Sequence, residues 1–179
     1  MIMLEGFKDL VRNQSMKKYA STEPTGILPL EKIRSAVAFI DVEDTSYDVC
    51  KVEIMNFFRS FGIKVDIFFI DFRKLTDGER LITSITTTVL KKDLNWFGRP
   101  SKEKIDLMLE GNPDLFLSMF PRNEYAVEFM AKCSKARFKI GRFQLPDNTF
   151  DLVIKDPAGR AYSEAEAFRE IAAFLRKIR

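Results

Sequence analysis

The sequence contains no histidine among its 179 residues and only two cysteines. Histidine is the commonest general base near neutral pH and the commonest neutral metal ligand in proteins. Ser-His pairs, Cys-His pairs and histidine-ligated zinc sites are therefore excluded within this chain. Cys50 and Cys133 each fall on the apolar face of a predicted helix, so we interpret both as small buried hydrophobic residues in a reducing compartment.

Long apolar runs and concentrated charge are absent as well. Glu5, Lys8, Asp9 and Arg12 interrupt the N-terminus where a signal peptide would be apolar, and no later run approaches the length of a membrane span. The 29 basic and 26 acidic residues are spread along the chain, without the concentrated positive field typical of nucleic-acid-binding proteins. We therefore expect a cytoplasmic protein with no membrane span and no nucleic-acid partner.

The glycine-rich phosphate motifs G-x-G-x-x-G and G-x-x-x-x-G-K-[ST] do not occur, and the first predicted strand-to-helix turn, "DVEDTS", is acidic. Asp41, Glu43 and Asp44 in this turn could hold Mg²⁺ through hard oxygen ligands. The same acids also suit the positive N-terminal end of the following helix, either as caps or through the helix dipole. We favour the second interpretation and expect neither a metal nor a cofactor.

The clearest structural signal lies between residues 35 and 72. Residues 36–40 form a continuous apolar run, as expected of a strand that is covered on both faces. Apolar residues then recur at helical spacing from Tyr47 to Phe61, Gly62 follows at the expected end of the helix, and "KVDIFFID" is a second buried strand. A strand, a helix and a strand over so short a distance indicate a βαβ unit with parallel pairing.

The alternation continues along the chain with further predicted elements. The predicted helices cover residues 4–19, 76–85, 102–110, 124–133 and 163–178, and the predicted strands cover 86–94, 114–120, 138–141 and 150–155. Ser101, Asn123 and Ser163 are the expected N-caps, Ser163 within a capping box. The pattern predicts an α/β, doubly wound, mostly parallel and Rossmann-like sheet of five or six strands with helices on both faces. Residues 1–31 are expected to form an amphipathic helix and a linker, and residues 32–179 a single domain.

A doubly wound sheet binds ligands at the carboxyl ends of its strands, where the strand order reverses. If the first and fourth strands flank that point, the candidate binding rim contains Asp41, Asp44, Thr45, Ser118, Arg122 and Asn123. Arg122 is either a contact for an anionic ligand or a solvated surface arginine. Trp96 could stack on a sugar or a base, but with Phe97 beside it we expect Trp96 to anchor its loop to the core.

Two resemblances follow from the stretch "DLFLSMFPRNEYAVEFMAKCSKARFKIGRF". Together with "KKDLNWFGRP" and "FDLVIKD", it resembles a family of small uncharacterised bacterial proteins, a domain of unknown function, over most of the chain after Arg34. It is more distantly similar to the N-terminal, acceptor-binding half of heptosyltransferase-type GT-B glycosyltransferases, in which D-L-x-I-D leads through a helix to A-x-x-x-I-G. The matching positions are Asp114, Leu115, Leu117, Ala136, Ile140 and Gly141.

The departures from the glycosyltransferase pattern limit what this resemblance implies. Ser118 stands where that pattern has an acid, and the sequence offers no second domain to hold a sugar nucleotide. The resemblance implies a Rossmann-like fold, which alone does not carry function. We interpret the protein as a non-catalytic binding or interaction module. The alternative is an enzyme or a binding protein for a small anionic ligand of sugar or phosphate type, a relic of a glycosyltransferase acceptor domain. The N-terminal helix also allows a homodimer.

Overall fold

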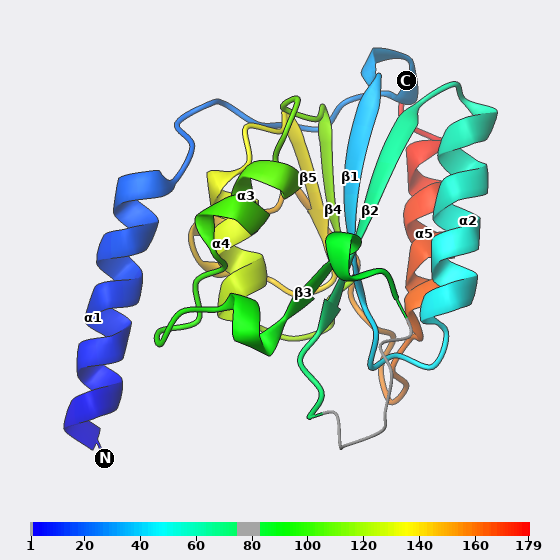
Figure 1. The fold of residues 1–179 in the computed structure, drawn as a ribbon. Coiled ribbons are helices and arrows are strands. Elements are labelled where there is room, and N and C mark those ends of the chain that lie inside the picture. Colours follow the sequence, from blue (N-terminus) through cyan, green and yellow to red (C-terminus); the bar gives the residue numbers. More distant parts are fainter. Residues whose placement is uncertain (1, 75–82) are drawn as a thin grey trace.

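The computed structural model describes residues 2–74 and 83–179, and these form a six-stranded parallel sheet with helices on both faces (Figure 1). The strands are β1 (Ser35–Asp41), β2 (Lys64–Asp71), β3 (Thr88–Leu90), β4 (Leu115–Ser118), β5 (Phe138–Gly141) and β6 (Leu152–Val153). The helices are α1 (Ile2–Tyr19), α2 (Tyr47–Ser60), α3 (Lys102–Met108), α4 (Tyr125–Cys133) and α5 (Glu164–Leu175). The predicted fold class, including the N-terminal helix, is confirmed.

The strand order is β3-β2-β1-β4-β5-β6, and every pairing is parallel. The chain moves outward from β1 to β3 on one side and then returns past β1 to build the other side. The order therefore reverses between β1 and β4, where Phe39 pairs with Ser118 near the carboxyl ends of both strands. A Rossmann-like sheet places its crevice at this position.

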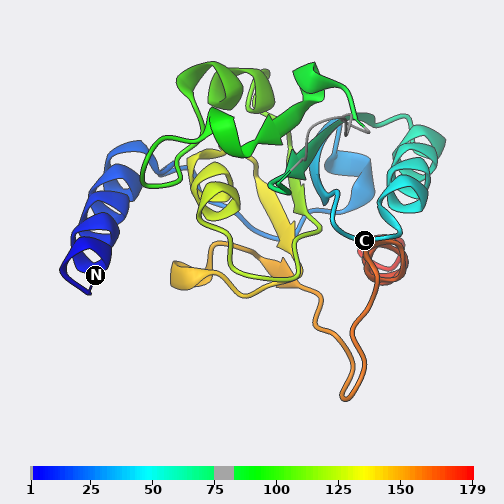
Figure 2. The same ribbon diagram turned by 60° about the horizontal axis from the view of Figure 1, so that its bottom comes forward.

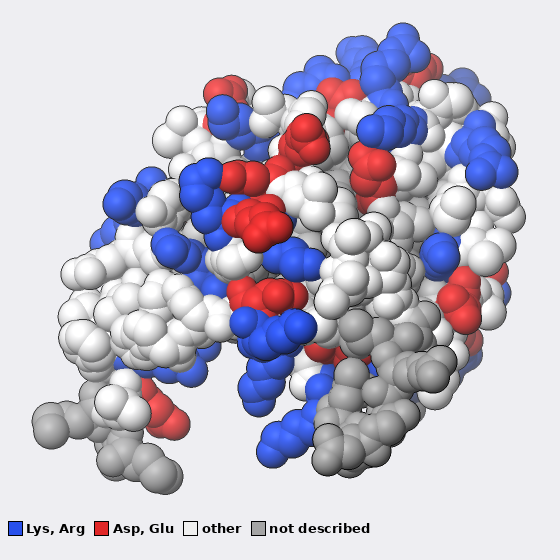
Figure 3. Space-filling view, viewed as in Figure 1, with Lys and Arg blue, Asp and Glu red and all other residues white. Residues whose placement is uncertain are grey.

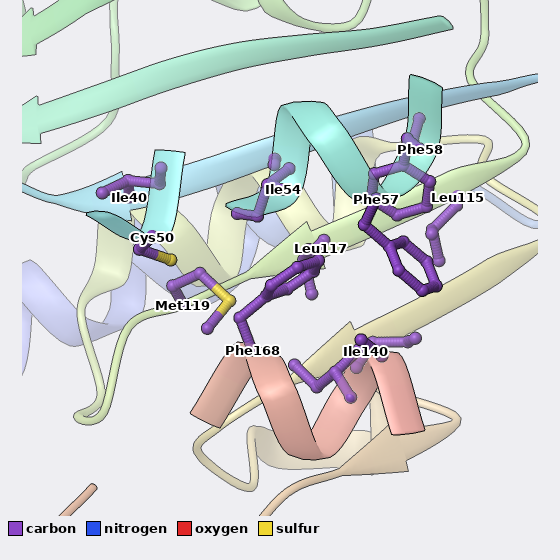
Figure 4. Close-up of a cluster of buried hydrophobic side chains, with 14 of the residues drawn as sticks. Ile40, Cys50, Ile54, Phe57, Phe58, Leu115, Leu117, Met119, Ile140 and Phe168 are labelled. Atoms are coloured by element: carbon purple, nitrogen blue, oxygen red, sulfur yellow. The ribbon is translucent and has the colours of Figure 1, made fainter. Parts of the chain in front are cut away.

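Alternate residues of β1 face two separate cores, because side chains of a strand point to opposite faces in turn. Ala38 and Ile40 face α2 and α5, whereas Val37 and Phe39 face α3 and α4. Figure 4 shows the first core, in which Phe57 of α2 meets Phe168 of α5 edge to face, with ring centroids 5.7 Å apart. Much of the chain's phenylalanine is therefore core.

α1 lies at the edge of the molecule, beside α4 and away from α2 and α5 (Figures 1 and 2). A small third core forms beneath it from Met16, Phe97, Tyr125 and Phe129. None of the described helices is apolar over a length that could cross a bilayer.

Several local predictions have a different outcome. The strands predicted over residues 86–94 and 150–155 are shorter in the structure, Thr88–Leu90 and Leu152–Val153. Asn123 is not the cap of α4, because that helix begins one residue later than predicted and Glu124 holds the N-cap position in an extended conformation, without a side-chain cap. Phe97, rather than Trp96, anchors its loop, and Trp96 is 59% exposed. Most of the helix predicted over residues 76–85 lies outside the described residues, and a short 3₁₀ turn occupies Ile85–Thr87.

Candidate functional site

Asp41 and Arg122 meet at the carboxyl edge of the sheet. Asp41 ends β1 and Arg122 follows β4, so the parallel pairing brings both residues to one edge. Arg122 Nη1 donates to Asp41 Oδ2 over 2.6 Å, and Arg122 Nη2 lies 3.5 Å from Glu43 Oε2. The carboxylate of Asp41 is buried, whereas the Arg122 side chain is 45% exposed and lies over the ring of Phe120. The two side chains form an ion pair in which the positive charge of Arg122 and the negative charge of Asp41 neutralise each other.

The acidic β1–α2 loop caps α5, which lies far from it in the sequence. Asp44 Oδ2 accepts a hydrogen bond from the backbone N–H of Glu164, and Ser46 Oγ accepts one from the N–H of Ala165, each over 3.1 Å. These amides are among those that a helix leaves unpaired at its N-terminus. The carboxylate of Asp44 therefore already occupies the anion-binding end of α5.

The remaining predicted rim residues differ in burial. Ser118 is buried, and its hydroxyl accepts the N–H of Phe120 over 3.4 Å. Thr45 and Asn123 are exposed on the surface. Across residues 2–74 and 83–179, no group of three or more His, Cys, Asp or Glu side chains is arranged to hold a metal ion.

The end of β2 is paired in the same way as the end of β1. Asp71 is buried at the last position of β2, and Arg73 donates to both of its carboxylate oxygens, over 2.8 and 2.7 Å. These hydrogen bonds hold the pKa of Asp71 below its usual range. Asp71 therefore stays ionised and orders the chain that leaves the sheet.

Glu164 is a buried carboxyl group that the sequence analysis missed. Its Oε1 accepts the backbone N–H of Asp41 over 2.7 Å, while Oε2 is buried without a hydrogen-bond partner among the described residues. The pKa of Glu164 is raised to about 9, chiefly by burial. The nearby carboxylates of Asp44 and Asp41 contribute to this rise, while that hydrogen bond and Arg142 oppose it. Glu164 is consequently protonated at neutral pH. As the first residue of an amphipathic helix it gives no sequence signal, because an acid there is ordinarily exposed.

Arg142 is the second buried residue that the sequence analysis missed. Its Nη2 donates to the carbonyl oxygen of Tyr162 over 2.7 Å and to Asp156 over 3.2 Å, and Nη1 donates to the carbonyl of Met119. Arg142 therefore ties the carboxyl ends of β4 and β5 to the loop before α5. Arg142 directly follows a predicted strand. Arg122 was selected because it follows the end of a strand, and the same criterion could have found Arg142.

The residues shared with the glycosyltransferase pattern have structural roles. Asp114 accepts the backbone N–H of Arg34 over 2.7 Å and two hydrogen bonds from Arg137, so it joins the amino ends of β1, β4 and β5. Gly141 lies against Phe150, whose ring would be 2.2 Å from a Cβ atom at that position. Asp114 lies at the amino edge of the sheet, whereas Gly141 is the last residue of β5 and lies at the carboxyl edge, where it leaves room for Phe150.

A pocket of about 430 Å³ lies on the other side of the molecule, between the last turn of α1, α3 and α4. Its lining combines apolar and basic side chains with one acid: Tyr19, Arg99, Lys102, Ile105, Asp106, Leu109, Asn112, Phe129, Cys133 and Lys135. Lys102 and Asp106 form an ion pair with each other. Burial raises the pKa of the Cys133 thiol to about 12, so this thiol is not a nucleophile at neutral pH.

Arg99 is the central charge of this pocket. Its guanidinium lies between the rings of Tyr19 and Phe97, at 5.3 and 5.6 Å from their centroids, and Nη1 donates to Ser15 Oγ over 3.5 Å. Nε of Arg99 is buried without a hydrogen-bond partner in the described part of the chain. Neither Arg99 nor Lys135 forms an ion pair with a carboxylate of the described residues. The pocket therefore carries positive charge that the protein itself does not neutralise.

The chain belongs to a family of unknown function, DUF6913, whose sequence profile matches residues 8–178. The match includes most of α1 and the linker as well as the sheet. No curated protein and no solved structure is significantly similar to this chain.

Proposed function

We propose that this member of a family of unknown function is a non-catalytic binding module that takes a small amphipathic anion in the pocket between α1, α3 and α4. The observation that supports this function is the guanidinium of Arg99, which lies on the pocket lining beside the rings of Tyr19 and Phe97 and forms no ion pair with a carboxylate of the described residues. A guanidinium in this state can donate to a carboxylate, sulfonate or phosphate without first giving up an acidic partner.

The shape of the pocket suits the rest of such a ligand. Ile105, Leu109 and Phe129 form an apolar wall, and the volume of about 430 Å³ falls within the usual range for small-molecule sites. A ligand with a hydrocarbon or aromatic body and one anionic group would bury its body against this wall. Lys135, exposed on the lining, would add a second, solvent-accessible charge.

The carboxyl edge of the sheet is the weaker candidate. Its carboxylates are already engaged: Asp41 and Asp71 by arginines and Asp44 by the first amide of α5. The alternative function, binding of a sugar or phosphate ligand by the rim predicted from the sequence, draws on the exposed part of Arg122 at the point where the strand order reverses. Such a ligand would have to displace Asp41 from Arg122.

The test is a titration of the whole protein with three named probes, 8-anilinonaphthalene-1-sulfonate, indole-3-acetate and octanoate, by calorimetry and by thermal shift. A probe that prefers the native state must raise its stability. We expect at least one probe to bind, and Arg99→Met to weaken its binding by at least about tenfold, because a charge-assisted hydrogen bond is lost.

Two matched variants locate the binding site. Arg34→Met removes an exposed arginine side chain that is not part of the pocket lining and should leave the affinity unchanged. Ile105→Trp fills the pocket and should abolish binding. If Arg99→Met and Arg34→Met bind every probe equally well, the pocket is not the site. If Arg122→Ala alone weakens binding, the rim is the site.

We also propose two broader properties. A cytoplasmic location is supported by Cys50 and Cys133, which are both unpaired. A division into an accessory segment, residues 1–31, and a domain, residues 32–179, is supported by the separate small core beneath α1.

A further inference from the structure

A row of exposed apolar side chains runs along the N-terminal half of α1. Leu4, Phe7 and Leu10 are 71%, 55% and 54% exposed, and Trp96 lies beside them. The rings of Phe7 and Trp96 stack with centroids 6.0 Å apart and an angle of 10° between their planes. Figure 3 shows this part of the surface as an uncharged area over the N-terminal half of α1 and the neighbouring loop. We call Leu4, Phe7, Leu10 and Trp96 the α1 apolar row.

The row is not needed to attach α1 to the rest of the molecule. Attachment comes from other positions of the helix: Met16 is buried in the third core, and Arg12 Nε donates to the carbonyl of Phe97 over 2.7 Å. Exposed apolar side chains that gather in one place mark an interaction surface more often than scattered ones do.

The charges of α1 are arranged around this row. With 3.6 residues per turn, Lys8 lies on one border of the row, while Glu5 and Asp9 fall on the opposite side of the helix from Phe7. Lys17 and Lys18 follow in the last turn of the helix, about two turns beyond Leu10. Asp9 is already paired with Arg12, at 3.6 Å. The lysines of α1 therefore lie beside the row or beyond its C-terminal end, and the acids of the helix lie away from it.

We propose that the α1 apolar row docks on the surface of an anionic lipid bilayer. Leucine and aromatic side chains on one helix face, with lysines beside them and farther along the helix, are features of an interfacial helix that enters the headgroup region. Tryptophan is enriched at that depth. The lysines would meet the negative cytoplasmic leaflet. A second copy of this chain is a poorer occupant, because a twofold pairing centred on Phe7 sets the Lys8 side chains of both copies on the same border. The proposal does not depend on the ligand of the α1/α3/α4 pocket.

The experiment uses the whole protein and vesicles of phosphatidylcholine with about 30% phosphatidylserine, compared with vesicles of phosphatidylcholine alone. Trp96 is the single tryptophan of the chain and serves as an internal probe. We expect co-sedimentation with the anionic vesicles, a blue shift of the Trp96 emission on binding, and binding at least about tenfold weaker to the neutral vesicles or in about 0.5 M salt.

Variants decide whether the row is responsible. Leu4→Ser and Phe7→Ser should each reduce binding to the anionic vesicles. The double variant Lys8→Gln, Lys17→Gln should also reduce this binding, and the Trp96 emission of the free protein should stay unchanged. Val52→Ser, which changes an exposed apolar residue of α2, is the matched control and should bind like the parent. Circular dichroism confirms that each variant is folded.

Two results would overturn the proposal. One is an absence of binding to the anionic vesicles, or binding that Leu4→Ser and Phe7→Ser leave unchanged. The other is a dimer in light scattering that becomes a monomer in Phe7→Ser, with no vesicle binding by the parent protein, since the row would then be covered by a second copy.

Discussion

At the scale of single residues, burial changes what a side chain can do. Glu164 lies at the first position of α5. An acid at this position normally faces water and interacts favourably with the positive end of the helix dipole. In this fold the position is fully buried between β1 and α5, near Asp41 and Asp44. A charged carboxylate would be costly there, so the proton is retained instead.

This proton predicts a pH dependence of stability. Because the pKa of Glu164 is raised from 4.5 to about 9 on folding, the folded state binds more protons than the unfolded state between these values. The contribution of this proton to the free energy of unfolding is complete below pH 4.5. It is lost as the pH rises toward about 9, by at most about 1.4 kcal/mol per pH unit. In Glu164→Gln, which keeps the acceptor for Asp41, the free energy of unfolding should depend less on pH across this range.

Urea unfolding measured from pH 5 to pH 9 checks this expectation. The control is Glu170→Gln, which removes an exposed carboxylate from the same helix and should keep the slope of the parent. An identical slope in Glu164→Gln and in the parent would show that Glu164 does not titrate abnormally.

At the scale of elements, α5 is fixed through its N-terminus. α5 uses its own capping box, in which Ser163 Oγ accepts the N–H of Glu166 over 3.2 Å, and it also uses Asp44 and Ser46 from the β1–α2 loop. The loop therefore joins β1 to α5 and helps to align α5 with α2. Among the acids of "DVEDTS", Asp44 therefore caps α5 and not the following helix α2, whose N-cap Ser46 makes no capping hydrogen bond through its side chain.

Removing these caps should destabilise the fold without changing its shape. Asp44→Ala and Ser46→Ala should each lower the free energy of unfolding by about 1 kcal/mol, the usual effect of losing an N-cap. The exposed neighbour Thr45→Ala should have no comparable effect, and urea unfolding distinguishes the three variants. Equal losses in Thr45→Ala and Asp44→Ala would mean that the loop acts through something other than capping.

At the scale of the whole molecule, α1 is attached along one side only. Arg12 provides much of this attachment: Nε donates to the carbonyl of Phe97, and the guanidinium lies 4.6 Å from the ring centroid of Tyr125. The last turn of α1 also supplies Tyr19 to the pocket that contains Arg99. The position of α1 therefore affects both the pocket and the α1 apolar row.

Arg12→Ala should loosen α1 and leave the sheet intact. Loss of one hydrogen bond and one cation–π contact corresponds to about 1 to 2 kcal/mol of local stability. We expect hydrogen exchange to become faster for the amides of residues 8–19 and to stay unchanged in β1 and β4. Lys17→Ala, on the exposed side of α1, is the control. Unchanged exchange in α1 of Arg12→Ala would show that the third core alone holds the helix.

Local sequence patterns determined most of the fold. The bounds of β2 and β5 agree with the prediction, and the capping box of α5 begins at the predicted serine. These features depend on neighbouring residues, through side-chain periodicity and local hydrogen bonds. The N-terminal boundary of α4 was harder to predict from the sequence. Asn123 and Glu124 can both precede the first turn of a helix, and packing selected between them.

Only the tertiary structure decided how the polar residues are used. The sequence places Asp41 and Arg122 at the ends of two strands, but their ion pair depends on β4 pairing with β1. The burial of Glu164 and the capping of α5 by Asp44 join residues more than a hundred positions apart, as does the small core beneath α1. Periodicity fixes which face of an element is apolar. Which charges become buried, paired or left exposed is fixed by the elements that pack against that face.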